Sequence, residues 1–219
     1  MLQFSGEALA YGDHTVLSGV DFHLRLGERV VLLGRSGAGK STLLNASYRR
    51  LAETHPDIAL VPQEHGLVPQ LSVFHNVYMG RLDAHGALYN LANLVWPFPA
   101  QRRTVASVLE TVGLAGFDRK AVESLSGGQK QRTALARAIH RGGRVLIGDE
   151  PVSAVDERHA AALVDELASR FETVLLALHD VGLARRVATR LVGIRAGRIS
   201  FDLPAGDVSD GDIHDLYRA

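Results

Sequence analysis

The segment GRSGAGKS, from Gly34 to Ser41, constrains the fold of this chain more than any other part of the sequence. It matches the pattern G-x-x-x-x-G-K-[ST] in full, and it lies between the apolar run VVLL and the helix-like segment STLLNASYRR. In this strand–loop–helix arrangement, successive backbone N–H groups at the start of a helix form a nest for a phosphate group. The sequence therefore predicts a phosphate-binding loop within an α/β fold.

Two side chains at the end of this loop indicate how it would hold a nucleotide. Lys40 would bring its positive charge to the β- and γ-phosphates, and the hydroxyl of Ser41 would ligate Mg²⁺. The alternative is a glycine-rich turn that binds nothing. Glycine makes up about 7% of average proteins, so a chance match to the whole pattern has a probability on the order of one per cent. We therefore expect a nucleotide with Mg²⁺ at this loop.

Short apolar runs alternate with helical segments, which is typical of an α/β protein with a mostly parallel sheet. Five of the runs are continuously apolar, as expected of strands that are covered on both faces. We predict buried strands at residues 29–33, 58–62, 144–147, 173–178 and 191–195, and more exposed strands at 21–26 and 198–201. Residues 73–141 are mostly helical. We predict one domain over residues 1–219, in which a catalytic core (1–72 and 142–219) carries an inserted helical subdomain (73–141).

Composition limits the kinds of partner. Lys plus Arg and Asp plus Glu both number 24, so the formal net charge is zero, and nucleic acid is not expected as a partner. The absence of cysteine excludes disulfides, thiolate metal sites and a cysteine nucleophile. The N-terminal residues show no secretory signal pattern, and no apolar run approaches the ~18–20 residues that span a bilayer. We therefore expect a cytoplasmic protein.

Polar residues follow three of the predicted strands, at the sheet edge where an α/β fold binds its ligand. Asp149 and Glu150 follow one strand: Asp149 would bind Mg²⁺, and Glu150 would orient or deprotonate a water that attacks the γ-phosphate. His179 follows a second strand and would contact the γ-phosphate. Gln63 follows a third and would touch Mg²⁺ or the water. A solvated acidic turn and a structural histidine are the alternatives.

The segment ESLSGGQKQRTALARA, at residues 123–138, predicts a helix with an unusual start. Ser126 followed by Gln129 fits a capping box, in which each residue satisfies a backbone N–H of the other. Capping does not explain Gly127 and Gly128, because glycine weakens a helix and suits a backbone that lies close against another group. We therefore expect another group to approach the backbone at this helix start.

The LSGGQ of residues 125–129, between a phosphate loop and an apolar strand that ends in Asp-Glu, resembles the signature of ABC-type ATPases. The resemblance covers nearly the whole chain, with the motifs in the family's order. It implies a Walker A loop that comprises Gly34, Arg35, Ser36, Gly37, Ala38, Gly39, Lys40, Ser41 and Thr42. It also implies that Tyr11 stacks on adenine and that Gln63 forms the Q-loop. Asp149 would be the Walker B aspartate and Glu150 the catalytic glutamate. Residues 153–156 would form the D-loop, and His179 would be the switch histidine. Val155 stands where leucine is usual in the D-loop.

In that family two ATPase domains meet head to tail, and ATP lies between the phosphate loop of one and the signature of the other. The resemblance therefore implies that Ser126, Gly127, Gly128 and Gln129 contact a nucleotide held by a second copy of the chain. A helix N-terminus favours such an anion, and the glycines permit a close approach. The expected cofactors are ATP and Mg²⁺, and the expected partners are a second ATPase subunit, as a homodimer, and transmembrane permease subunits.

Three kinds of protein carry such motifs: the ATPase of a membrane importer, a non-transport ABC protein, and another phosphate-loop enzyme such as a nucleotide kinase. The signature and the Asp-Glu pair disfavour the kinase, and the compact, neutral chain disfavours the non-transport protein. The segments NVYMGRL, LVWPFP, VLETVGL and LVGIRAGRISF resemble phosphonate-importer ATPases. We therefore expect import of phosphonate, phosphite or a related oxyanion, at the cytoplasmic face of the membrane, with a periplasmic solute-binding protein as an indirect partner. Another small-solute importer, an exporter or a lipoprotein-release ATPase is the alternative.

Three further expectations extend or depart from that resemblance. Only LAETHPD separates the phosphate-loop helix from the next strand, which predicts a partly truncated antiparallel N-terminal β region. The surface that receives a permease coupling helix is expected at Val68, Leu71, Val73 and Phe74, with ordinary packing as the alternative. The aromatic- and proline-rich residues 82–100 are expected to pack in the core of the helical subdomain, or else to form a docking surface.

Overall fold

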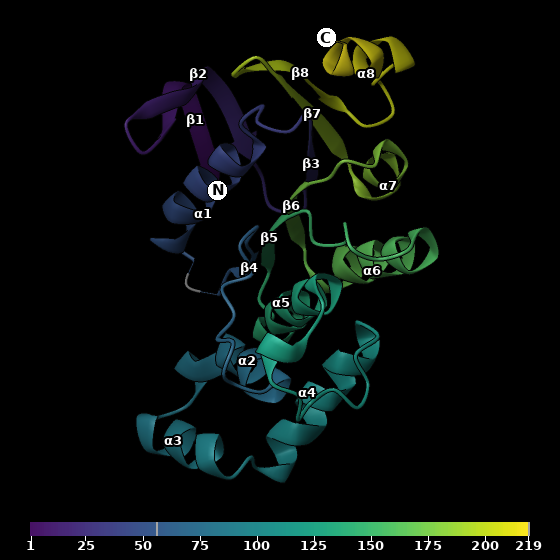
Figure 1. The fold of residues 1–219 in the computed structure, drawn as a ribbon. Helices are drawn as coiled ribbons and strands as arrows, with labels where there is room; N and C mark the ends of the chain where they lie inside the picture. The colour runs from purple at the N-terminus through teal and green to yellow at the C-terminus, as the bar shows by residue number, and fades with distance from the viewer. Residues whose placement is uncertain (56, 219) are drawn as a thin grey trace.

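The computed structural model describes residues 1–55 and 57–218 and contains the predicted mostly parallel sheet (Figure 1). Its six strands lie in the order β4-β5-β6-β3-β7-β8, and only β7 and β8 pair antiparallel. They are β3 (Arg29–Leu33), β4 (Ala59–Val61), β5 (Val145–Asp149), β6 (Thr173–Ala177), β7 (Arg190–Arg195) and β8 (Arg198–Pro204). The five predicted buried strands are thus confirmed, with bounds that shift by one or two residues.

The sheet is covered on both faces, as the continuous apolar runs predicted. Along β3, Val30 and Leu32 belong to the hydrophobic cluster that includes helix α1 (Lys40–Ala52). Val31 and Leu33 belong to the other cluster, which includes α6 (Glu157–Arg170) and α7 (Val181–Val187). This alternation follows from the two-residue period of a strand. Figure 1 shows α1 on one side of the sheet and α6 and α7 on the other, with α8 (Asp210–Tyr217) beyond β7.

A separate antiparallel pair, β1 (Leu2–Tyr11) and β2 (His14–Leu24), lies beside α1 at the N-terminal end of the fold (Figure 1). The antiparallel N-terminal β region implied by the resemblance is therefore present. The residue pattern, however, predicted only a strand at 21–26, which overlaps the end of β2, and did not predict β1. Its alternation is broken by register shifts around Glu7 and Leu9, and Gly6 has a positive φ of 64°. Such bulges interrupt the two-residue pattern by which a strand is recognised in a sequence.

Residues 73–141 are mostly helical in the structure, as the sequence pattern predicted, and the first helices of this range lie at the end of the molecule away from β1 and β2 (Figure 1). They are α2 (Val73–Tyr78), η1 (Met79–Ala84), α3 (Ala87–Val95) and α4 (Pro99–Thr111), followed by η2 (Val122–Ser124) and α5 (Gly127–Arg141). The long helix α5 lies between these helices and the sheet (Figure 1). No helix in the described part of the chain combines the length and apolarity that crossing a bilayer requires.

At two places in the helical region, the structure distinguishes between the alternatives that the sequence left open. Val73 and Phe74 are buried in the hydrophobic core, so they cannot receive a permease helix at the surface, although Val68 is exposed. Residues 82–100 were expected in the core of the helical subdomain or else on a docking surface, and Trp96 is 76% exposed and so lies outside the core. The inner face of α3 is formed by more polar side chains, such as the buried Asn93, and its apolar residues therefore face outward.

Candidate active site

The phosphate loop joins β3 to α1, and its glycines are required by the space around them. Gly34, Gly37 and Gly39 all have positive φ angles, of 149°, 78° and 111°. A Cβ on Gly34 would lie 2.3 Å from the carbonyl oxygen of Ile194, and a Cβ on Gly39 would lie 2.5 Å from the side chain of Leu17. The loop therefore keeps its shape only with glycine at these two positions.

Lys40 opens α1 and lies within the loop, where it is 6% exposed. Its ammonium donates hydrogen bonds to the carbonyl oxygens of Gly34, at 2.7 Å, and Arg35, at 3.1 Å. Burial lowers the pKa of Lys40, and the carboxylates of Glu150 and Asp149 oppose this effect. A positive charge is thus fixed beside the loop backbone and close to the two acidic residues.

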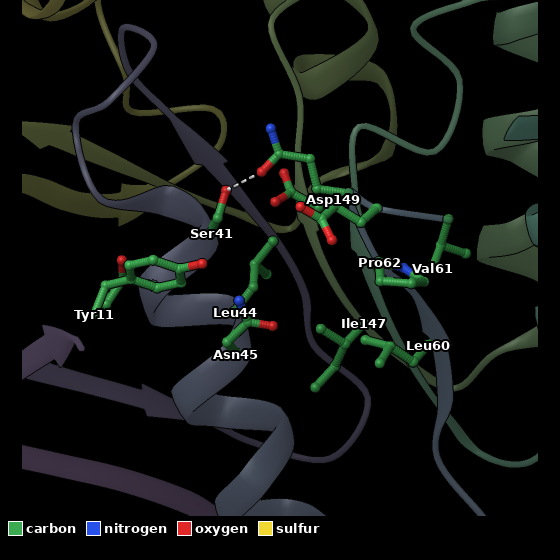
Figure 2. A pocket seen from close by; sticks show the side chains of 12 residues that line it. Tyr11, Ser41, Leu44, Asn45, Leu60, Val61, Pro62, Ile147 and Asp149 are labelled. Atoms are coloured by element: carbon green, nitrogen blue, oxygen red, sulfur yellow. Dashed lines mark hydrogen bonds between the residues drawn. The ribbon is translucent and has the colours of Figure 1, made fainter. Parts of the chain in front are cut away.

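Oxygen atoms from α1, from the loop after β4 and from the end of β5 meet beside Lys40. The hydroxyl of Ser41 donates to Oε1 of Gln63 at 3.4 Å, and Figure 2 shows Asp149 beside this pair. Burial raises the pKa of Asp149, while its hydrogen bond with Ser41 acts in the opposite direction. A nearby cation would therefore stabilise the charged form of this carboxylate.

These three groups suit a hard cation such as Mg²⁺, which binds oxygen ligands. They offer one carboxylate only, and no group of three or more His, Cys, Asp or Glu residues that could hold a metal lies within residues 1–55 and 57–218. Mg²⁺ characteristically uses one or two carboxylates and completes its six ligands with phosphates and water. The residues present fit that pattern.

A cavity of about 390 Å³ adjoins this oxygen cluster, between α1 and the ends of β4 and β5 (Figure 2). Tyr11, at the end of β1, forms one wall and is 74% exposed, so one face of its ring is free to stack on a flat ligand. Thr42 and Asn45 of α1 also line the cavity. Asn45 was not predicted, since nothing in the sequence marks it except its place one helical turn after Ser41.

Glu150 and His179 lie together at the carboxyl edge of the sheet, as predicted. Nε2 of His179 pairs with Oε1 of Glu150. Glu150 has a positive φ of 50°, and its N–H donates to the carbonyl oxygen of Ala177 at 3.1 Å. A non-glycine residue rarely adopts this backbone conformation, which is enriched at functional sites.

The start of α5 confirms the predicted capping box. Oγ of Ser126 accepts from the N–H of Gln129 at 3.3 Å, and Oε1 of Gln129 accepts from the N–H of Ser126 at 3.0 Å. A Cβ on Gly128 would lie 3.1 Å from the carbonyl oxygen of Ala154, so this glycine allows a close contact within the chain. A Cβ on Gly127 would meet nothing within 4 Å. The chain itself therefore explains Gly128 but not Gly127.

The predicted nucleotide residues fall into two groups. The phosphate loop, Gln63, Asp149, Glu150 and His179 share one sheet edge, with Tyr11 beside it. Residues 126–129 lie at the start of α5, and Ser126 and Gly127 are exposed. Among the described residues, those that line the cavity beside Ser41 include none from α5. The site within one chain thus contains the first group only.

Gln131 is a residue of this region that the sequence did not single out. It lies on α5 and is 7% exposed, and its amide contacts Glu150, Ser153 and Ala154. The available signal was a glutamine on the same face of the helix as the buried Leu135 and Ala138, where an apolar residue is expected.

A loop of this form on a parallel sheet, with an acidic strand end and a capped LSGGQ helix, defines an ATP-binding-cassette ATPase. The family model described as "ABC transporter" matches residues 17–153, and the chain belongs to this family. The "Phosphonates import ATP-binding protein PhnC" of Frankia casuarinae is 38% identical over all of this chain and 96% of that protein. "Phosphonates import ATP-binding protein PhnC 1" of Natronomonas pharaonis is 36% identical over 99% of each chain.

A solved structure has the same fold. The structure titled "Dimeric Structure of MJ0796, a Bacterial ABC Transporter Cassette" superposes with a TM-score of 0.80 over 94% of this chain and 99% of that one. The two sequences are 24% identical, so this likeness concerns the fold alone. The fold class predicted from the sequence is confirmed.

Proposed function

We propose that the chain is the ATP-hydrolysing subunit of a membrane importer for phosphonate, phosphite or a related phosphorus oxyanion. One observation supports the ATPase role: three sets of groups lie at one edge of the sheet. They are the Lys40 ammonium, the oxygens of Ser41, Gln63 and Asp149, and the Glu150–His179 pair. Parallel α/β sheets bind ligands at this edge. The substrate class is proposed from the names of the relatives at 36–38% identity.

In this proposal, residues 34–39 and Thr42 cradle the phosphates of ATP, and Lys40 contacts the β- and γ-phosphates. Tyr11 stacks on the adenine from the wall of the adjoining cavity. Ser41, Gln63 and Asp149 hold Mg²⁺, which neutralises charge on the phosphate oxygens when it is bound. These residues position the γ-phosphorus at the edge where Glu150 ends its strand.

Hydrolysis transfers the γ-phosphoryl group to water. The water oxygen bonds to the γ-phosphorus while the bond from that phosphorus to the β–γ bridging oxygen breaks, which leaves ADP and inorganic phosphate. The Glu150 carboxylate orients the water and accepts its proton. His179 holds this carboxylate through Nε2 and lies where it can reach the γ-phosphate. Most of the acceleration comes from positioning and electrostatics.

The second group of residues completes the site in a homodimer. Ser126 and Gly127 are exposed at the N-terminus of a 15-residue helix, apart from the cavity beside Ser41. In the head-to-tail dimer, residues 126–129 contact the γ-phosphate held by the partner subunit, and the helix dipole favours its charge. ATP therefore bridges two subunits, whereas ADP makes fewer bridging contacts, and hydrolysis shifts the equilibrium between closed and open dimers.

The permease subunits bind in this proposal at a groove between the core and the helical region. A hollow of about 510 Å³ is lined by Tyr48 and Leu60 on one side and by Met79, Leu82 and Arg137 on the other, with the exposed Val68 at its rim. An apolar helix end of the permease fits such a groove. This contact holds the subunit at the cytoplasmic face of the membrane, and the solute-binding protein acts on the far side.

The experiment that tests the proposal uses the purified subunit together with the proposed permease and solute-binding protein, in proteoliposomes. We expect ATP hydrolysis to rise when the binding protein is loaded with methylphosphonate, and to stay basal with a sugar or an amino acid. Lys40→Ala is expected to lower hydrolysis by roughly 100-fold or more. Stimulation by an amino acid or sugar instead would reject the substrate class, and full activity of Lys40→Ala would reject the site.

A further inference from the structure

We infer that Gln131 is a positioning residue for hydrolysis, which holds Glu150 in its working orientation and links it to the signature helix. This inference rests on the proposed role of Glu150 as the group that acts on the attacking water. Gln131 lies on α5, about one helical turn after the exposed Gly127, and its side chain points to the turn that follows β5. Nothing in the sequence pattern assigned it a role.

The amide of Gln131 makes contacts along the whole turn at residues 150–154. Nε2 donates to the carbonyl oxygen of Glu150 and to Oγ of Ser153, the latter at 2.9 Å. Oε1 accepts from the N–H of Ala154 at 3.0 Å. One side chain thus binds the first, fourth and fifth residues of this turn.

The conformation of Glu150 explains why this support matters. Its φ of 50° is unfavourable for a residue with a Cβ, and such a conformation persists only when the surroundings hold it. The N–H of Glu150 is fixed by the carbonyl oxygen of Ala177, and its own carbonyl oxygen is fixed by Gln131. Together these two bonds set the direction in which the Glu150 side chain leaves the backbone, toward His179.

Glutamine suits this position chemically. The site needs a donor for Glu150 and Ser153 and an acceptor for Ala154, and a primary amide supplies both. Gln131 is 7% exposed, so water has little access to replace a lost bond. An apolar side chain would leave the carbonyl oxygen of Glu150 without this donor, and a carboxylate would oppose it with negative charge.

The same helix carries Ser126, five residues before Gln131, which corresponds to about 7.5 Å along the helix axis. The close contact of Gly128 with Ala154 adds a second attachment between α5 and the turn. A change at the start of α5 is therefore passed to Glu150 of the same chain through backbone and amide contacts. In the dimer, ATP bound at the partner's nucleotide site thus changes the position of Glu150 in the subunit whose α5 contacts that ATP.

The first test compares Gln131→Met with the wild type in the full chain. We expect kcat for ATP to fall roughly tenfold or more, while the affinity for ATP stays within about twofold, because the phosphate contacts are untouched. The matched control is Gln101→Met on α4, whose amide bonds to Tyr89 and His85 away from the site, and which should keep the wild-type kcat. An unchanged kcat in Gln131→Met, or an equal loss of affinity and kcat together with a large fall in Tm, would overturn the inference.

The second test is the pH profile of Gln131→Glu. A buried carboxyl has a raised pKa, and its protonated form can again donate to the Glu150 carbonyl. The ratio of the variant's kcat to that of the wild type should therefore rise as the pH falls from 8 to 6. A ratio that is flat with pH would contradict the donor role of Gln131.

Hydrogen exchange separates this inference from the proposed function. In Gln131→Met the N–H of Ala154 loses its acceptor, so it should exchange faster than in the wild type, whether or not the chain hydrolyses ATP. Normal turnover by Glu150→Gln would reject the proposed role of Glu150, and with it a role of Gln131 in hydrolysis, but would leave the faster exchange at Ala154 in Gln131→Met unaffected. Unchanged exchange at Ala154 would reject the positioning role alone.

Discussion

Gly34 shows at the scale of one residue how the phosphate loop depends on its surroundings. Gly34 has a φ of 149°, which residues with a Cβ rarely adopt. The carbonyl oxygen of Ile194, on the neighbouring strand, occupies the space that a Cβ would need. Lys40 in turn uses the carbonyl oxygen of Gly34 as its nearest hydrogen-bond partner. The position of the lysine charge therefore depends on a glycine six residues earlier.

We predict that Gly34→Ala destabilises the protein and abolishes ATP binding. The added methyl carbon would lie 2.3 Å from a backbone oxygen, so either the loop or β7 must shift. The expected loss is about 2–4 kcal/mol in the free energy of unfolding, measured in urea. Gly206→Ala is a suitable control, because a Cβ there meets nothing within 4 Å, and it should stay within about 0.5 kcal/mol of the wild type. Wild-type ATP affinity in Gly34→Ala would contradict the prediction.

Helix α5 joins several parts of the molecule. Its N-terminus is the capped LSGGQ segment, Gln131 holds the turn after β5, and Arg137 donates to the carbonyl oxygens of Gly66 and His65, both at 2.6 Å. The helix thus contacts the turn after Glu150 and the loop after Gln63. In the proposed function, this helix couples the nucleotide site to the groove for the permease.

We predict that Ser126→Ala removes the cap of α5 and also the ATP-driven dimer. Loss of the capping hydrogen bond should cost about 1 kcal/mol in the free energy of unfolding. Ser209→Ala removes an equivalent capping box from α8, away from the signature, and should cost about the same. Only Ser126→Ala should weaken dimer formation with ATP, as measured by light scattering. Equal dimer formation by the two variants would contradict a nucleotide contact at Ser126.

We predict that the stability of the protein falls in mild acid because of His140 on α5. His140 is 5% exposed, and burial, with help from the charges of Arg81 and His85, lowers its pKa to about 4 from an unperturbed 6.5. As the pH falls, the His140 side chain therefore takes up a proton in the unfolded chain at a higher pH than in the folded one. Its contribution to the free energy of unfolding is fully present above pH 6.5 and is lost as the pH falls toward 4. At pH 5 the loss is about 2 kcal/mol relative to pH 7.5.

Urea unfolding at pH 7.5 and pH 5 tests this expectation. His140→Leu should remove about 2 kcal/mol of the difference between the two pH values. The exposed His14 provides the control, since His14→Leu should leave the difference unchanged. The same pH dependence in His140→Leu and the wild type would assign the acid sensitivity to other groups.

At the scale of the whole molecule, the proposed function divides the site between two copies of the chain. One chain provides the phosphate loop, the oxygen cluster and Glu150, and the exposed start of α5 supplies the remaining phosphate contacts to the partner subunit in the proposed dimer. ATP is then part of the interface, and hydrolysis removes a bridging phosphate. This arrangement converts chemistry at a sheet edge into separation of two subunits.

We predict that Glu150→Gln forms a stable dimer with ATP and Mg²⁺. The amide cannot accept the proton of water, so turnover should fall roughly 100-fold or more while ATP binding is retained. Light scattering should show a dimer with ATP and a monomer with ADP. The double variant Glu150→Gln with Ser126→Arg should remain monomeric, and a dimer in that variant would place the interface elsewhere.

Much of the site was predictable because its signals are local in sequence. The phosphate loop, the Asp149-Glu150 pair and the capping box of Ser126 each lie within a few consecutive residues, whose backbone geometry follows from short-range rules. Gln63 and His179 could be placed beside them because parallel strands end at a common edge. The burial of β3 to β7 likewise followed from continuous apolar runs.

The features that were missed depend on contacts between distant residues. The residue pattern did not predict β1, because its bulges interrupt the alternation of apolar and polar residues. The exposure of Trp96 was not decided by the sequence, because it depends on how α3, whose apolar face points outward, packs against its neighbours. Gln131 lies 19 residues from Glu150, and Gly34 lies 160 residues from Ile194, so only the folded chain brings them together. The sequence by itself determined which groups could bind phosphate and metal, because short motifs set local backbone geometry. Tertiary packing alone decided which side chains hold those groups in place, because that depends on the surfaces of elements far apart in the chain.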